Sequence, residues 1–173
     1  MDFVVLVAAR RAIQHDALST KPSNDPLYKM CRLAIIVFLA ECIEPMSILW
    51  PFHKYSSRAL MLALDDCDRL GHWETRPELL LWATIVGGFA ARETPLRWWY
   101  FEQIRSFPRN RPAGQSWDDV QKMAERYLPF KYRHGQGCQK FWEDARAWTS
   151  HDRYTLVERV KGDDHLQPPQ EEA

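Results

Sequence analysis

The stretch Thr75–Phe107, TRPELLLWATIVGGFAARETPLRWWYFEQIRSF, decides the fold of this 173-residue chain. Residues Leu79–Ala91 are apolar on almost every side, which is typical of a helix at the centre of a helical domain. Thr94 and Pro95 then form a helix start signal, and the helix that follows is crowded with aromatic side chains. Because the apolar helix holds core-forming residues, the segment predicts an architecture and not a reaction.

Two adjacent glycines, Gly87 and Gly88, lie inside the apolar helix. Each costs about 1 kcal/mol of helix stability relative to Ala, so their presence needs a compensating gain. Ala83, Gly87 and Ala91 form a stripe of small residues at spacings of four, which allows a neighbouring helix to approach closely. We therefore expect tight helix packing here rather than a phosphate-binding loop.

Helical periodicity continues through the rest of the chain, and no strand pattern appears. The expected helices cover residues 3–18, 31–42, 56–70, 116–128, 138–148 and 152–160, with loops at 21–26, 108–114 and 131–137. Thr75 with Glu78 and Ser116 with Asp119 have the spacing of capping boxes, and Gly71 marks a helix end. The sequence thus predicts a single all-α, multi-helix domain over residues 1–160 and a disordered polar tail at 161–173.

The charge balance argues against nucleic-acid binding by this chain. The chain has 23 basic and 23 acidic residues, so its formal net charge is zero and it lacks the general attraction to phosphates that dominates such binding. A local basic group at Arg97, Arg105, Arg109 and Arg111 is best interpreted as a solvated face. The longest apolar runs are shorter than the roughly 18 residues that a bilayer span requires, so we expect no membrane segment and a soluble protein.

The four cysteines, Cys31, Cys42, Cys67 and Cys138, lack the short paired spacing of zinc ligands. We expect free thiols in a reducing compartment, with no cofactor and no metal. Cys138 lies near His134, but no motif of a catalytic thiol surrounds it, and a structural cysteine is the favoured interpretation.

Three aspartates, Asp65, Asp66 and Asp68, are the sharpest enzymatic signal in the chain. Aspartate-rich helices hold Mg²⁺ in isoprenoid-type enzymes, because several carboxylates on one surface suit a hard cation. The spacing differs from that of those enzymes, and a second acidic motif is missing. A small helical metal-dependent enzyme is therefore the alternative hypothesis, and a solvated helix end beside Arg69 is the preferred one.

The aromatic helix leaves one question open. Leu96, Tyr100, Ile104 and Phe107 form one apolar stripe, while Trp98 and Phe101 lie off it. Both could be buried within the domain. Alternatively, Trp98 and Phe101 form a surface for a protein partner, or line a site for a small-molecule effector.

Three segments together resemble a known family: CRLAIIVFLAECIEP at Cys31–Pro45, LALDDCD at Leu62–Asp68, and ELLLWATIVGGFAARETPLRWWYFEQI at Glu78–Ile104. They are similar to the fungal-specific transcription factor domain, the helical regulatory region of fungal regulators that carry a binuclear zinc–cysteine cluster. The similarity covers about residues 27–148. Its most telling parts are Trp82, the Gly87–Gly88 pair and the aromatic cluster at residues 98–101.

The resemblance implies a non-enzymatic, all-α regulatory domain of a nuclear protein, which associates with itself or with a protein partner. The six-cysteine DNA-binding cluster of that family, and its basic linker, are absent from this sequence, so direct DNA binding is not implied. The chain resembles only the C-terminal part of such a regulator. It is expected to be a truncated regulator or a standalone relative, and cytoplasmic if the resemblance does not hold.

Overall fold

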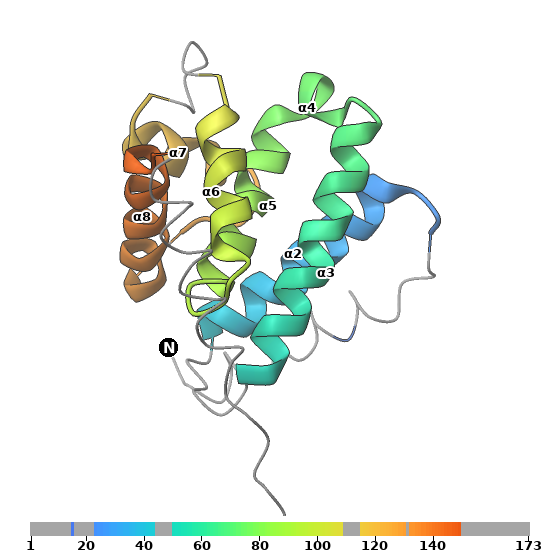
Figure 1. Ribbon diagram of the computed structural model, residues 1–173, viewed down its shortest axis with the longest axis horizontal. Helices are drawn as coiled ribbons and strands as arrows, with labels where there is room; N and C mark the ends of the chain where they lie inside the picture. Colours follow the sequence, from blue (N-terminus) through green and yellow to red (C-terminus); the bar gives the residue numbers. More distant parts are fainter. Residues whose placement is uncertain (1–14, 16–22, 44–49, 109–114, 131, 150–173) are drawn as a thin grey trace, which may run out of the picture.

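The computed structural model describes residues 15, 23–43, 50–108, 115–130 and 132–149. Within these residues the protein is all-helical and forms one compact domain (Figure 1). This confirms the fold class that the sequence predicts. The described helices are α2 (Pro26–Ile43), α3 (Trp50–Arg69), α4 (His72–Thr75), α5 (Pro77–Ala90), α6 (Arg97–Ser106), α7 (Trp117–Ala124) and α8 (Tyr132–Ala147).

Helix α5 is the centre of the domain, as its composition predicts. It contacts every other described helix, and it lies between the antiparallel α2–α3 pair on one side and α6, α7 and α8 on the other (Figure 1). From Leu80 to Gly88 every residue of α5 is buried. A helix that is apolar all round has to be enclosed in this way, because any face left in water would lose the free energy of burial.

The two glycines of α5 are explained by two aromatic rings. A Cβ at Gly87 would lie 2.6 Å from the ring edge and hydroxyl of Tyr100 on α6, and a Cβ at Gly88 would collide with the ring of Phe141 on α8. The Tyr100 hydroxyl passes over Gly87 and donates a 2.6 Å hydrogen bond to the backbone carbonyl of Ser57 on α3. The predicted close approach at this stripe is therefore confirmed, and it joins α3, α5 and α6.

Helix boundaries differ from the prediction most at the starts of α2, α3 and α8 and at the end of α7. Helix α3 begins at Trp50, before the expected start at residue 56, and Pro51 lies in its first turn, where a missing N–H costs nothing. Helix α8 begins at Tyr132, so the predicted loop at 131–137 is wrong over its helical part. Glycines are typical of loops, but Gly135 and Gly137 lie in α8 and allow other residues to approach its backbone. A Cβ at Gly137 would collide with the Phe89 ring, and a Cβ at Gly135 would lie 2.9 Å from the Phe130 carbonyl oxygen.

Some of the predicted helix caps and helix ends are confirmed and others are wrong. Gly71 ends α3 with a left-handed φ of 71°, and Ser116 caps α7 by accepting a 3.2 Å hydrogen bond from the Asp119 amide, both as expected. The capping box of Thr75 is wrong, because α4 extends through Thr75 and leaves Arg76 at the cap position without a side-chain bond. Thr94 fixes the turn before α6 by accepting from the Leu96 amide at 3.3 Å, and it does not cap the helix itself.

The expected helices at 3–18 and 152–160 and the expected tail at 161–173 lie outside the described residues, apart from His15, which is helical.

Candidate functional site

Helix α3 has one buried face and one exposed face. Ser57, Leu60, Leu64 and Cys67 point into the core and are wholly buried. On the opposite side, residues recur at spacings of three and four and share one stripe. We call this stripe the outer face of α3; it consists of Tyr55, Arg58, Ala59, Leu62, Asp65, Asp66 and Arg69.

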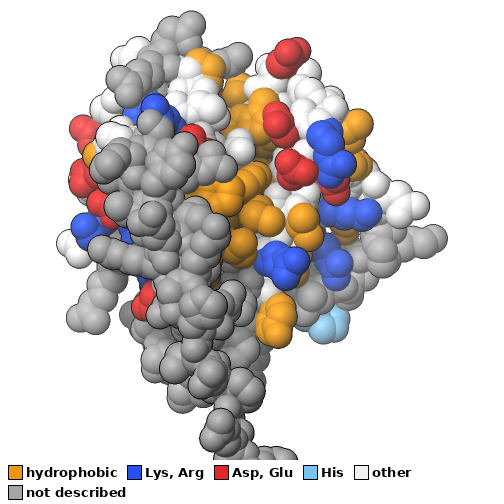
Figure 2. Space-filling view, viewed as in Figure 1, with side chains coloured by type: hydrophobic (Ala, Val, Ile, Leu, Met, Phe, Trp, Pro, Cys, Tyr) orange, Lys and Arg blue, Asp and Glu red, His pale blue; other side chains and the backbone are white. Residues whose placement is uncertain are grey.

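Large exposed hydrophobic side chains concentrate on or beside this face. Among the described residues they are Tyr55 (69% exposed), Leu62 (52%) and Leu70 (60%), of which the first two belong to the outer face of α3. Figure 2 shows hydrophobic side chains interspersed with charges of both signs over α3. Sequence reasoning missed Tyr55 and Leu62, because it took Leu62 for an ordinary helix residue and began the helix after Tyr55. Their spacing of seven residues within one helix is the signal that could have found them.

A groove of about 360 Å³ runs beside the outer face, between α2 and α3. Leu33 from α2 and Ala59, Leu62 and Ala63 from α3 supply apolar walls. Lys29 and Arg32 add basic groups on the α2 side, and Asp66 adds an acidic one on the α3 side. Apolar surface bordered by charges of both signs is characteristic of a protein-binding surface rather than a catalytic pocket.

The aspartates that suggested a metal site are engaged with a neighbouring arginine. Arg69 pairs with Asp66 at 2.5 Å and with Asp65 at 3.2 Å, across one turn of α3. Asp68 lies on another side of the helix and is exposed. Within the described ranges, no three His, Cys, Asp or Glu side chains are grouped so that they could hold a metal ion. The local arrangement is that of a solvated helix end with favourable dipole charge.

Phe101 and Trp98, whose burial the sequence did not decide, differ in how exposed they are. Phe101 is 5% exposed, and its ring centroid lies 5.1 Å from those of Phe141 and Trp148. It therefore belongs to the core between α6 and α8, which is the first of the two alternatives that the sequence left open. Trp98 is half-buried, so a partner surface there stays a prediction.

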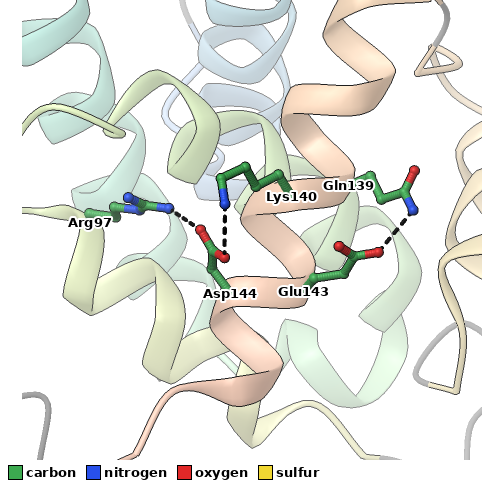
Figure 3. Close-up of polar contacts among 5 residues, drawn as sticks. All are labelled: Arg97, Gln139, Lys140, Glu143 and Asp144. Carbon is green, nitrogen blue, oxygen red and sulfur yellow. Dashed lines mark hydrogen bonds and ion pairs between the residues drawn. The ribbon is translucent and has the colours of Figure 1, made fainter.

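Arg97, a member of the predicted basic group, joins α6 to α8 (Figure 3). Its guanidinium donates a 2.7 Å hydrogen bond to Asp144, which also lies 3.6 Å from Lys140, and it stacks 4.8 Å from the Phe101 ring centroid. Gln139 and Glu143 form a separate bond on the same helix at 2.8 Å. Arg97 is therefore paired within the fold, whereas the sequence favoured a solvated face for this basic group.

Cys31, Cys67 and Cys138 are free thiols. Cys67 and Cys138 are buried and Cys31 is half-buried. Burial raises the pKa of the Cys67 thiol from 9.0 to about 11, and the nearby Cys31, Asp25 and Asp66 add to the rise. A raised pKa disfavours the thiolate, so Cys67 is poorly suited to nucleophilic chemistry.

A second hollow, of about 480 Å³, lies between α4 and the end of α6. Trp73 and Phe107 form its aromatic side, with ring centroids 6.3 Å apart, and the acidic Asp68 and Glu74 line it as well. Its volume falls within the roughly 300–1,000 Å³ that small-molecule sites occupy. A small-molecule effector would therefore fit this hollow by size, as it would the groove between α2 and α3.

Comparison of the chain with models of known protein families, with curated proteins and with solved structures found no match. None of the helices that the structure describes is both long and apolar enough to cross a membrane.

Proposed function

We propose that this protein is a non-enzymatic regulatory domain that works by binding protein, similar to the C-terminal part of a fungal transcription factor and acting in the nucleus. The observation that carries the proposal is the outer face of α3. It presents Tyr55 and Leu62 to solvent beside a groove with charged edges, and exposed apolar side chains gathered in this way mark interaction surfaces.

The residues that carry the family resemblance also support a non-enzymatic role, because they are used in packing. Trp82, Gly87, Gly88 and Tyr100 are all buried, and each of them packs α5 against a neighbouring helix or segment. Trp82, for example, donates a 3.0 Å hydrogen bond from its indole nitrogen to the Leu128 carbonyl. The shared pattern therefore specifies a scaffold, and function is left to the surface that the scaffold displays.

The alternative, a small metal-dependent enzyme of the isoprenoid type, has weaker support. Two of its three carboxylates, Asp65 and Asp66, share Arg69 and are about half exposed, at 49% and 50%. Enzymes that use Mg²⁺ on a diphosphate need carboxylates that converge on a cavity where the substrate also fits. Here Asp66 lines the groove between α2 and α3, Asp68 lines the hollow beside α4, and Asp65 lines neither, so the carboxylates do not converge on one cavity.

The proposal is tested by attaching the chain to an unrelated DNA-binding module and measuring transcription of a reporter gene. We expect the fusion to change reporter output relative to the DNA-binding module alone. Calorimetric titration with Mg²⁺ should show no saturable binding to the purified protein. Turnover of an allylic diphosphate that requires Mg²⁺, and that Asp65→Ala with Asp66→Ala abolishes, would overturn the proposal in favour of the enzyme.

A further inference from the structure

We propose that the outer face of α3 binds a second copy of this chain, with the two α3 helices antiparallel and a two-fold axis at Leu62. This inference rests on the proposed function, since it names the partner of the same surface. It goes further because it fixes the orientation, the register and the residues that meet.

The register follows from the spacing of the residues on the face. Tyr55, Leu62 and Arg69 recur every seven residues and form the middle line of the outer face. When two such helices run antiparallel about an axis at Leu62, a residue before Leu62 meets a residue about equally far after it in the second copy. Leu62 then packs on Leu62 of the second copy, and Tyr55 meets Arg69 of the second copy, where its ring can stack on the guanidinium.

The charges on the face are complementary to themselves in this orientation. Arg58 and Asp65 are also seven residues apart, so both lie on the same side of the middle line. The antiparallel arrangement keeps that side together in the two copies and places Arg58 beside Asp65 of the second copy, and the two-fold axis forms this pair twice. A parallel arrangement would carry these side chains of the two copies to opposite edges of the contact, where they could not pair. The charge order therefore favours the antiparallel dimer.

Both charged groups are available for the contact. Among the described residues Arg58 makes no ion pair, and its side chain is exposed. Asp65 is 49% exposed and shares Arg69 with Asp66, so Arg69 keeps Asp66 at 2.5 Å when Asp65 turns to a new partner. Because exposed pairs within one helix contribute only about 0.3–0.5 kcal/mol, this exchange costs little.

The same charges disfavour the main competing occupant. An acidic amphipathic helix would suit Lys29, Arg32 and Arg58, but it would also have to lie against Asp65 and Asp66. A partner that complements the whole face needs an acidic group opposite Arg58 and a basic group opposite Asp65. An antiparallel second copy of α3 supplies both. The line from Tyr55 to Arg69 is about 21 Å long, which makes a small interface and a dissociation constant on the order of micromolar.

The test is a charge exchange between two variants of the full chain, followed by sedimentation velocity over a range of concentrations. Arg58→Glu and Asp65→Lys should each weaken dimerisation of the purified variant at least tenfold, because two like-charge contacts form in each dimer. An equimolar mixture of the two variants should dimerise within threefold of wild type. In the mixed dimer the glutamate introduced at position 58 meets the lysine introduced at position 65, and the native Asp65 of the first variant meets the native Arg58 of the second.

Matched controls separate this surface from others. Leu62→Asp should abolish dimerisation, whereas Leu70→Asp, which changes an equally exposed leucine beyond the end of α3, and Trp98→Ala should leave it unchanged. A mixture that stays monomeric, or loss of the dimer in Trp98→Ala but not in Leu62→Asp, would overturn the proposal. A wild-type chain that is monomeric at all concentrations, and whose reporter output still depends on Leu62, would overturn the dimer and retain the proposed function.

Discussion

Gly88 and Phe141 meet where α5 crosses α8, and this contact shows how single residues determine the packing of the domain. The Phe141 ring occupies the space that any side chain at position 88 would need, and Phe141 itself is 2% exposed. Gly87 and Tyr100 form the equivalent contact between α5 and α6. The sequence predicted that small residues admit a neighbour here, since glycines in an apolar helix need a reason. It could not name the rings, which come from positions far along the chain.

Gly88→Ala is expected to destabilise the protein. Alanine gains about 1 kcal/mol of helix propensity, but the overpacked ring costs about 1–3 kcal/mol in a core that has no room to adjust. Urea unfolding measures the change. The matched background is Phe141→Leu, where the smaller side chain leaves space and the same Gly88→Ala substitution should cost less. A Gly88→Ala protein that is more stable than wild type would contradict this account of the glycine.

The stability of the protein is expected to fall between pH 9 and pH 11, in part through Cys67. Its thiol has a pKa of about 11 in the folded protein against 9.0 as the reference value. The contribution of the Cys67 thiol to the free energy of unfolding is fully present below pH 9. It is lost as the pH rises toward 11, because the thiol loses its proton at a lower pH in the unfolded chain than in the folded protein. The free energy of unfolding of Cys67→Ala should therefore decline less over this range. If the free energy of unfolding declined equally with pH in wild type and Cys67→Ala, the thiol would have the same pKa in the folded and unfolded protein, which would contradict the prediction.

At the scale of the helices, the boundaries depend on which residue is placed at the cap position. Ser116 begins α7 as its spacing with Asp119 predicts, since both groups are local in sequence. Thr75 has an equally good pattern but belongs to α4, a helix of four residues that no periodicity revealed. Likewise, Gly135 and Gly137 favoured a loop, and only the closeness of Phe130 and Phe89 explains their place at the start of α8. Local signals predict helix ends until a tertiary contact overrides them.

Ser116→Ala and Thr75→Ala make a direct comparison of a real cap and an apparent one. Removing the Ser116 hydroxyl leaves the Asp119 amide without its acceptor and should cost about 1 kcal/mol. Thr75→Ala removes only an exposed 3.4 Å bond from its hydroxyl to the His72 carbonyl, and should change the free energy of unfolding by less than about 0.5 kcal/mol. Urea unfolding of the two variants measures both changes. Equal losses would mean that Thr75 does cap α5.

At the scale of the molecule, the arrangement separates scaffold from surface. Helix α5 is enclosed by all its neighbours, and the residues that made its pattern recognisable are used in packing. The sequence predicted this scaffold well, because composition and periodicity indicate which residues are buried. It predicted the candidate site poorly, because the exposed Tyr55 and Leu62 resemble core residues until the buried face of α3 is known. Phe101, selected for its place off the stripe, is covered by Trp148, which lies beyond the end of α8.

The central claim is that the outer face of α3 carries function and contributes little to folding. Leu62→Asp and Leu70→Asp test it, since both replace an exposed leucine by the same charged residue and only Leu62 belongs to the face. Both variants should unfold within about 0.5 kcal/mol of wild type. The measurement is reporter output from each variant fused to an unrelated DNA-binding module. We predict that output is lost in Leu62→Asp and retained in Leu70→Asp; equal output from the two variants would contradict the claim.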